Sequence, residues 1–579
     1  MDDNKLIPAL QQDWVRFECC KIRNAKVIWA DHSLLADDSP ESVASYYKSL
    51  VQENAYAIKD TPSFANIEFD LSDTKSLVAE RYGGWGIGKN GGGGRCGNSG
   101  KYQLKGIGAN CMVGSHDDEI HRDGGLDAVS AIIEIIYTHV LSILLPLGTV
   151  KIHGLILIGR KTAYYHHPKN LRWGTIMLRD NCLRPAHLMP APLFEPRPEY
   201  ESILISDVAR IRKINKDLFT SFSGPGGFIQ YLGQFLANCA NQFGFARAAR
   251  IMHGALSPSN ITMSGQWFDL PLSTLLSGGI NQSRSSDFYT EHSAPLNYAT
   301  ELLHGFSKYN GLQLNPAPLV NYYTEQFEAY FRFYIGFVLG ILQFVDLIDS
   351  AKWKRLTDAF DAVIHRNGSL TIRRVVADEN DPVHALIAAF FVSVYSPEAA
   401  EPILSSAKIS EIDSQRVVNH SSDIMNTVWK LHQPEYPVKD ASKDHFYIAT
   451  ALIALKRAYL ATVFYSPLLT ENVWDMCKFM RSPDDVSPLI SSYIRLADWI
   501  FEKANEQITL FKSDVMEIIY MQSDGTYRVE RPDTNLSTYS CYEDLFIFLK
   551  TIHRKDFVIN DFSFFDFFIK LDRVIPLMR

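Results

Sequence analysis

The chain has 579 residues, which is too long for one hydrophobic core and predicts roughly three or four structural units. Its hydrophobic content of 46% and aromatic content of 12% are typical of a packed globular protein and exclude disorder. The net charge of -8 is mild and spread along the chain, so bulk electrostatics disfavours nucleic acid and anionic membranes as partners.

Eight cysteines are scattered without a Cys-x-x-Cys pair, so the sequence indicates neither a zinc site nor a disulfide framework. The acidic N-terminus lacks the features of a secretory signal, and we expect a cytoplasmic protein. Residues 128–145 approach the length of a membrane span, but they carry Glu134 near their middle. Because a carboxylate within a membrane is costly, a buried helix is expected there and no membrane span.

Residues 1–75 carry no recognisable chemistry and are interpreted as an N-terminal extension. Residues 76–165 then predict a β-rich lobe. Within it, residues 83–94 contain eight glycines in twelve positions, followed by Arg95 and a short strand that ends at Gly106. Glycine lets a backbone approach phosphates closely, because no Cβ intervenes and N–H groups can point at the ligand. A flexible surface loop is the alternative interpretation.

Lys105 lies in that short, half-apolar strand, where a lysine needs a partner. The apolar helix that follows offers Glu134, which isoleucines flank on both sides. A carboxylate in such surroundings is costly unless it meets a cation. A strand lysine paired with a helix glutamate beneath a glycine loop is how kinase-like folds hold ATP phosphates. The alternative is two unrelated residues, each satisfied elsewhere.

Residues 166–350 predict a mostly helical lobe that begins with Arg179 and Arg184, either an anion clamp or a solvated pair. A long helical pattern over residues 228–252 leads to His253 and then to Asn260 and Asp269, nine positions apart. That spacing is typical of a hairpin that brings an amide oxygen and a carboxylate together, and two such ligands suit Mg²⁺. An ordinary polar turn is the alternative. Residues 351–579 are expected to form a helical C-terminal extension.

Several local motifs occur in one order along the chain, and together they resemble the selenoprotein O family of protein adenylyltransferases. They are Tyr82-Gly-Gly-Trp, Gly92-Gly-Gly-Arg95, Gln103-Leu-Lys-Gly, Asp123-Gly, Met177-Leu-Arg179, Leu183-Arg184-Pro-Ala-His, and His253-Gly with Asn260, Gly265 and Asp269. Weaker similarity extends from about residue 25 to about residue 345. The resemblance implies an α+β, protein-kinase-like fold with two lobes, to which this chain adds its large helical C-terminal region.

The resemblance also implies a site. ATP would bind with its phosphates reversed relative to ordinary kinases, so that AMP is transferred to a protein or peptide. Lys105, steadied by Glu134, would hold phosphate, and Arg179 and Arg184 would take the far phosphate. Asn260 and Asp269 would carry Mg²⁺, with Asp269 also counted as catalytic. The nucleotide would be lined by Gly92, Gly94, Arg95, Asp123 and Gly124.

The chain departs from the family at Ser259, where the family has an aspartate as its proposed general base. A serine cannot accept a hydroxyl proton at neutral pH without help. Three explanations remain: a degenerate nucleotide-binding partner subunit, a replacement carboxylate, or an acceptor that is itself a carboxylate. We favour the third, whose product is an acyl-adenylate, as in the maturation of a microcin-like peptide. True kinase activity is disfavoured, because the chain has no His-Arg-Asp or Asp-Phe-Gly sequence.

Overall fold

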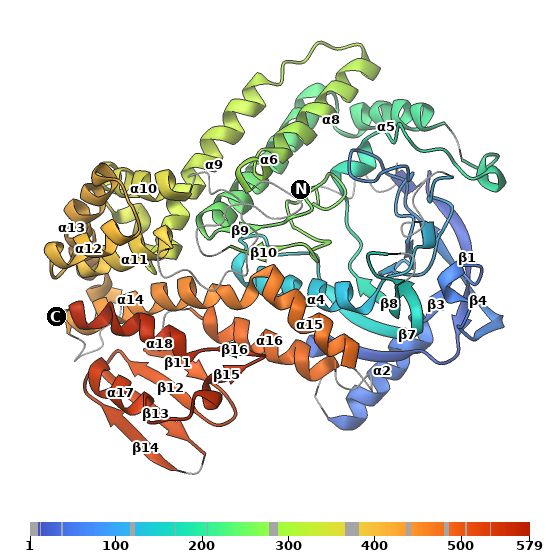
Figure 1. Cartoon of the computed structure of the whole chain (residues 1–579). Coiled ribbons are helices and arrows are strands. Elements are labelled where there is room, and N and C mark those ends of the chain that lie inside the picture. The colour runs from blue at the N-terminus through green and yellow to red at the C-terminus, as the bar shows by residue number, and fades with distance from the viewer. Residues whose placement is uncertain are drawn as a thin grey trace.

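The computed structural model describes residues 10–578 except 12, 36, 38, 116–121, 168–169, 205, 277–287, 365–380, 436–441, 480–485, 504–505 and 533. These residues form a mixed helix and strand architecture with one large antiparallel sheet (Figure 1). The α+β class expected from the sequence is therefore correct.

The large sheet has eight strands in the order β2-β7-β8-β6-β5-β4-β1-β3, and every neighbouring pair is antiparallel. The short strand β6 lies between β5 and β8, with Gln103 opposite Arg179 and Lys105 opposite Met177. Side chains alternate along a strand, so Gln103, Lys105 and Arg179 share one face, while Leu104 and Leu178 are buried on the other. The strands are β1 (Val15–Ile22), β2 (Lys26–Ala30), β3 (Tyr56–Ala57), β4 (Phe69–Ala79), β5 (Cys96–Asn98), β6 (Gln103–Lys105), β7 (Ile152–Tyr164) and β8 (Leu171–Arg179).

The N-terminal strands belong to this same sheet. Strand β1 pairs with β4 along its length, from Val15 opposite Ala79, and β2 pairs with β7 from Lys26 opposite Leu157. Strand β4 crosses residue 75, the boundary expected between the N-terminal extension and the β-rich lobe. The reason is that both partners of residues 15–30 lie far along the chain, which local patterns do not reveal. Helix α2 (Pro40–Asn54) connects β2 to β3.

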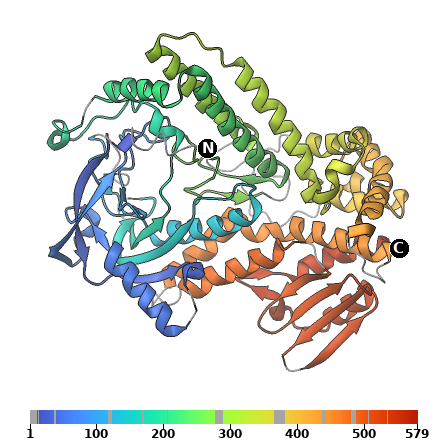
Figure 2. The same ribbon diagram turned by 180° about the vertical axis from the view of Figure 1, so that it is seen from behind.

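Helix α4 (Ala128–Leu144) carries Glu134 and is buried on nearly all sides. Asp127 caps its N-terminus by accepting a hydrogen bond from the Ser130 N–H at 2.9 Å. One face of α4 packs on β7 and β8, and helices α15 (Ser466–Phe479) and α16 (Val486–Ile500) cover the other face, as Figures 1 and 2 show from opposite sides. The C-terminal region therefore holds α4 against the sheet.

A helical lobe follows the sheet and supplies the second half of the site. Its long helices α6 and α9 pack along each other, and α8 lies against both. The short strands β9 (Ile251–Met252) and β10 (Thr274–Leu275) pair at either end of the segment that carries Asn260 and Asp269. The helices of this lobe are α5 (Asp207–Ser221), α6 (Pro225–Ala248), α7 (Phe288–Glu291), α8 (Ala294–Asn310) and α9 (Ala317–Val338).

The region after residue 350 begins with helices, as the sequence predicted, and continues into a small β-sheet. Beyond the helices, the chain forms an antiparallel sheet in the order β11-β12-β13-β14, so the helical extension expected from the sequence also contains strands, over residues 507–539. An Asp524-Gly525 turn with Gly525 at φ +72° joins β12 to β13. The elements are α10 (Ser350–Ile364), α11 (Pro382–Val392), α12 (Pro397–Ser406), α13 (Glu411–Glu435), α14 (Lys443–Leu460), β11 (Gln507–Lys512), β12 (Glu517–Met521), β13 (Thr526–Arg531), β14 (Thr534–Tyr539), α17 (Tyr542–Leu549), β15 (Val558–Ile559), β16 (Phe562–Ser563) and α18 (Phe565–Asp572).

Among the described residues, one helical stretch, Lys443–Phe464, is long and apolar enough to cross a membrane. Of its most apolar window, 78% is buried inside the molecule, as in the core helix of a soluble protein. The apolar helix α4 is shorter and is buried, which agrees with the interpretation that Glu134 lies in a core helix.

Candidate functional site

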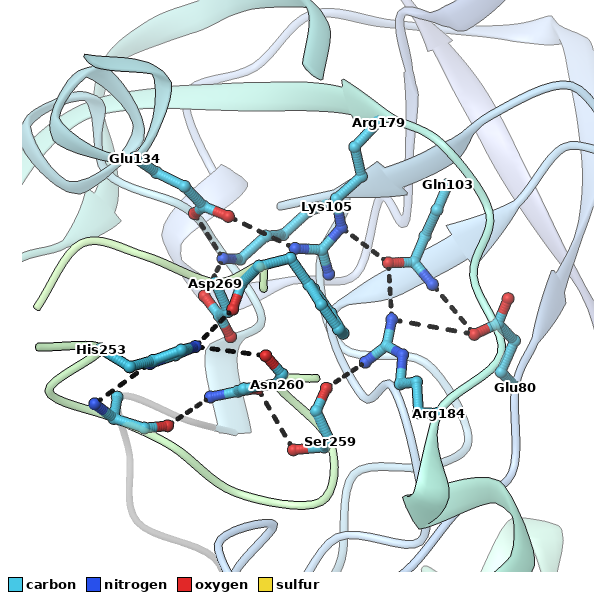
Figure 3. A network of polar contacts seen from close by, with 12 residues as sticks. Glu80, Gln103, Lys105, Glu134, Arg179, Arg184, His253, Ser259, Asn260 and Asp269 are labelled. Carbon is cyan, nitrogen blue, oxygen red and sulfur yellow. Dashed lines mark hydrogen bonds and ion pairs between the residues drawn. The ribbon is translucent and has the colours of Figure 1, made fainter. Parts of the chain in front are cut away.

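Residues 253–269 form the hairpin that the spacing of Asn260 and Asp269 predicted. Ile261 pairs with Trp267, and the Phe268 N–H donates a hydrogen bond to the Asn260 carbonyl at 3.3 Å. Asn260 therefore lies opposite Phe268, beside Asp269. Asp269, at the end of this hairpin, lies next to the face of the large sheet that carries Lys105 (Figure 3).

His253 holds the base of this hairpin together. Its Nε2–H lies 3.2 Å from the Asn260 carbonyl and 3.1 Å from the Phe268 carbonyl, so one donor joins the two strands. Burial lowers the pKa of His253 to about 4, which keeps the ring neutral at physiological pH. The Asn260 amide nitrogen donates to the Ala255 carbonyl at 2.8 Å, and this contact fixes the direction of the amide oxygen.

Lys105 lies between two carboxylates. Its Nζ donates to Glu134 Oε2 at 2.7 Å and also to Asp269 Oδ1, so the strand lysine joins α4 to the hairpin (Figure 3). The side chains of Lys105 and Glu134 are 1% and 2% exposed, whereas that of Asp269 is 24% exposed. The predicted Lys105–Glu134 pair is thus confirmed, and Asp269 is the member that remains accessible to solvent.

Arg179 and Arg184 are brought together by one glutamine. Gln103 Oε1 accepts hydrogen bonds from Arg179 Nε at 2.8 Å and from Arg184 Nη2 at 2.9 Å. Arg179 also donates to Glu134 at 3.3 Å, and Gln103 donates to Glu80 at 2.9 Å. Both guanidinium groups are buried, so the alternative of a solvated arginine pair is wrong.

Phe268 forms the apolar wall beside these cations. The guanidinium carbons of Arg179 and Arg184 lie 5.1 Å and 4.6 Å from its ring centroid, within cation–π range. Arg184 also donates to the Ser259 carbonyl at 3.1 Å. The hairpin and the sheet are therefore joined by a stacked ring as well as by ion pairs.

Electrostatics keeps Asp269 ionised. Burial alone would raise the pKa of this carboxyl, but the positive charges of Lys105, Arg95 and Arg179 outweigh burial and hold the pKa well below its ordinary value. The backbone of Asp269 has φ +61°, a left-handed conformation that costs a non-glycine residue about 1–3 kcal/mol. A fixed anion in a strained backbone is typical of a functional position.

The glycine-rich loop lies directly on the hairpin segment. A Cβ on Gly86 would be 2.8 Å from the Cβ of Ser257, and one on Gly84 would be 3.0 Å from Pro258 Cγ. The loop therefore needs glycine at these positions to reach residues 257–258. Gly92 and Gly94 lie at its base, where added Cβ atoms would meet Glu80 and Val113 of the same lobe. They shape the loop through its own packing.

Two of the expected nucleotide-lining residues are engaged elsewhere. The Asp123 carboxylate accepts hydrogen bonds from the N–H of Ser63 at 2.9 Å and from its hydroxyl at 2.5 Å. Gly124 has φ +75° and packs against the backbone of Gly108. These contacts direct Asp123 and Gly124 toward the segments of Ser63 and Gly108, which precede α4, rather than toward Lys105. Arg95 is half-buried, and its charge acts on Asp269.

Ser259, at the position of the family's general base, is buried. Its hydroxyl lies 2.8 Å from the Ser257 hydroxyl and donates to Asn260 Oδ1 at 3.3 Å. In the part of the chain that the structure describes, no carboxylate hydrogen-bonds to the hydroxyl of Ser259. A replacement base among these contacts is therefore not found.

A divalent cation at this site would have few protein ligands. Outside the undescribed segments, no group of three or more His, Cys, Asp or Glu side chains is arranged to hold a metal. Asn260 and Asp269 supply an amide oxygen and an ionised, partly exposed carboxylate, which are hard donors. Mg²⁺ needs only one or two such groups when substrate phosphates and waters complete its shell.

Three residues of the site escaped the sequence reasoning. Gln103 and Glu80 extend the arginine network, and Glu291 accepts the backbone N–H groups of His253 and Gly254, each at 2.9 Å. Gln103 had a signal, because it precedes Lys105 by two positions and so shares its strand face. Glu80 and Glu291 had none, because their partners are distant in sequence.

A scan of the chain against models of known protein families finds none that matches, and a search of curated proteins finds no matching relative.

Proposed function

We propose that this chain is an ATP- and Mg²⁺-dependent adenylyltransferase with a protein-kinase-like fold, related to the selenoprotein O family, whose acceptor is a carboxylate of a protein or peptide. The observation that carries the proposal is the position of Lys105 between Glu134 of helix α4 and Asp269 of the hairpin. A glycine loop over one lobe and a hairpin from the other support the two-lobed arrangement.

The residues present fit a nucleoside triphosphate and its metal ion. Asn260 and Asp269 would hold Mg²⁺, which when bound neutralises phosphate charge and aligns the leaving group. Lys105, kept in place by Glu134, supplies a cation for phosphate oxygens. Arg179 and Arg184 add two buried guanidinium groups, whose planar forks suit phosphate. Nucleotidyl transfer depends mainly on such positioning and charge neutralisation.

The acceptor class follows from Ser259. A hydroxyl acceptor must lose a proton during attack, and the hydroxyl of Ser259 cannot take it at neutral pH. A carboxylate attacks the α-phosphorus with its own oxygen, forming one oxygen–phosphorus bond while the bond to pyrophosphate breaks. The products are an acyl-adenylate and pyrophosphate, and no proton has to be removed. This chemistry is consistent with a site whose other phosphate-handling residues are kept.

The competing function is a nucleotide-binding partner subunit without turnover, which the absence of a carboxylate at position 259 favours. Both proposals predict ATP binding, but only the adenylyltransferase predicts release of pyrophosphate. Binding is measured by equilibrium dialysis with ATP and Mg²⁺, and turnover by pyrophosphate release in the presence of candidate peptides and hydroxylamine, which traps acyl-adenylates as hydroxamates.

The adenylyltransferase predicts pyrophosphate release and hydroxamate formation in equal amounts, both lost in Lys105→Met. The matched control is Lys48→Met, a change of an exposed lysine on helix α2, outside the ion-pair network. ATP binding without pyrophosphate release for any peptide would favour the partner subunit. Absence of ATP binding would contradict both proposals.

A further inference from the structure

Residues 464–466 of the C-terminal region contact both elements that supply the proposed site. They lie at the start of helix α15, which is beside α4 in both views of the molecule (Figures 1 and 2). The Phe464 carbonyl accepts a hydrogen bond from the hydroxyl of Tyr137 on α4 at 2.9 Å. The Ser466 N–H donates to Thr274 Oγ1 on β10 at 3.0 Å. One short segment therefore joins α4 to the strand that follows the hairpin.

Tyr137 connects this segment to the part of α4 that carries Glu134. It lies three positions after Glu134, which is about one helical turn. Its side chain is fully buried, and burial raises the pKa of the hydroxyl, so the group stays protonated and donates. The tyrosine thus fixes α4 close to the carboxylate that pairs with Lys105.

Thr274 connects the same segment to the base of the hairpin. It lies opposite Met252 in the pairing of β9 with β10, and Met252 directly precedes His253. The neighbouring Ser273 hydroxyl donates to the His253 carbonyl at 3.1 Å. Thr274 is 1% exposed, so it is held within the core. A shift of this threonine would therefore move the base of the hairpin.

The segment is itself fixed in the hydrophobic core of the C-terminal region. The ring of Phe464 is fully buried, and its centroid lies 6.3 Å from that of Tyr493 and 5.9 Å from that of Phe501. Further along α15, Trp474 stacks on Tyr165 at the end of β7, with ring centroids 4.7 Å apart. These contacts hold residues 464–466 in place independently of α4.

The link through residues 464–466 complements the direct one through Lys105. Lys105 contacts Glu134 and Asp269, but in the proposed reaction it also donates to phosphate oxygens. The second link uses backbone groups and two hydroxyls that have no part in that reaction. The segment after α4 holds the tip of the hairpin, where Thr149 pairs with Trp267, so residues 464–466 fix the opposite end.

We propose that residues 464–466 act as a brace that fixes α4 relative to the hairpin, and that Tyr137 and Thr274 are positioning residues for the reaction proposed at Lys105. The positioning role rests on the proposed function, whereas the brace does not. Loss of either hydrogen bond should loosen both α4 and the hairpin. It should lower turnover more than ATP affinity, because small misplacements of reacting groups act mainly on the rate.

Hydrogen exchange followed by mass spectrometry tests the brace in the full-length protein without any substrate. Tyr137→Phe removes one hydroxyl and keeps the ring, so the amides of α4 should exchange about tenfold faster. The amides of the hairpin should also exchange faster, by at least about threefold. Thr274→Val keeps the side-chain shape, removes Oγ1 and should produce the same two changes. Exchange that stays unchanged, or that rises only in the element nearest the substitution, would overturn the proposal.

The double variant tests whether the two hydrogen bonds act as one unit. Either single change breaks the brace, so the second should add little. The increase in exchange of α4 should be at least about threefold below the product of the two single increases. An increase equal to that product would contradict a shared brace.

Turnover separates positioning from general stability. Tyr137→Phe should lower kcat for pyrophosphate release about tenfold and change the KM for ATP less than about threefold. The matched control is Tyr542→Phe, because the Tyr542 hydroxyl is also buried and donates to a backbone carbonyl, that of Phe568, at 2.6 Å. The control should speed exchange in α17 and leave kcat unchanged.

Equal losses of kcat in the two tyrosine variants would contradict the positioning role. An unmodified chain that releases no pyrophosphate would contradict the proposed function and the positioning role together. The exchange measurements decide on the brace in either case, because they need no turnover.

Discussion

Glu134 is the carboxylate that both Lys105 and Arg179 contact, at 2.7 Å and 3.3 Å. Glu134→Gln keeps the shape and one acceptor oxygen but leaves two buried cations facing Asp269 alone. Breaking a buried ion pair by removing one partner costs about 3–5 kcal/mol. Because Lys105 retains Asp269, we expect the lower end, about 3 kcal/mol.

A chain with several units does not unfold in one step, so the loss is best measured locally. Hydrogen exchange of the amides of helix α4 reports the free energy of opening that helix. The matched control is Glu328→Gln on the exposed face of α9, where a change within about 0.5 kcal/mol is expected.

A second variant isolates charge from shape. Adding Lys105→Met to Glu134→Gln leaves Arg179 opposite Asp269, so the cluster is again balanced in charge. The double variant should recover at least half of the stability lost in Glu134→Gln. Two results would refute the reasoning. One is that the amides of α4 are as well protected in Glu134→Gln as in the control variant; the other is that the stability losses of the single variants Glu134→Gln and Lys105→Met simply add in the double variant.

The remaining predictions concern the base position, the glycine loop and His253. Ser259→Ala should change pyrophosphate release less than about tenfold, while a loss of about a hundredfold would identify a base role. Gly86→Ala should raise the KM for ATP, because its Cβ would meet Ser257. Gly100→Ala, at a similar φ of +88°, has open space around its Cβ and should leave the KM unchanged. Equal effects of the two variants on the KM would contradict a contact between the loop and Ser257. Because burial lowers the pKa of folded His253 from 6.5 to about 4, the unfolded chain binds more protons in that window, and stability present above pH 6.5 is lost as the pH falls. His253→Gln should therefore show a smaller loss of local stability between pH 7 and pH 5 than the unmodified chain, as measured by hydrogen exchange of the hairpin amides corrected for intrinsic rates, and equal losses would contradict the assignment.

Much of the site follows from local sequence. Glu134 lies in an isoleucine-rich helix and Lys105 in an apolar strand, and burying either charge without a partner of opposite charge is costly. Burial alone therefore predicted that the two residues pair. The nine-residue spacing of Asn260 and Asp269 likewise predicted a hairpin. These inferences are correct because each depends on the immediate neighbours of one residue.

Other contacts depend on pairings between distant segments. Gln103 joins the two arginines only because β6 and β8 set it opposite Arg179. Asp123 finds Ser63, sixty positions earlier in the chain, and so serves the start of α4. The terminal sheet had a usable local signal, since Asp524-Gly525 between β-branched runs is typical of a hairpin. The abundant aromatic residues with helical spacing after residue 350 favoured a helical interpretation of residues 507–539 instead.

The most direct test of the central claim is to incubate the chain, Mg²⁺ and a candidate peptide with ATP labelled at either the α- or the γ-phosphate. Products are trapped before labile adenylates hydrolyse. Transfer of AMP predicts that the α-label becomes attached to the acceptor while the γ-label leaves in pyrophosphate, and that both signals vanish in Asp269→Asn. Attachment of the γ-label to the acceptor would contradict the account.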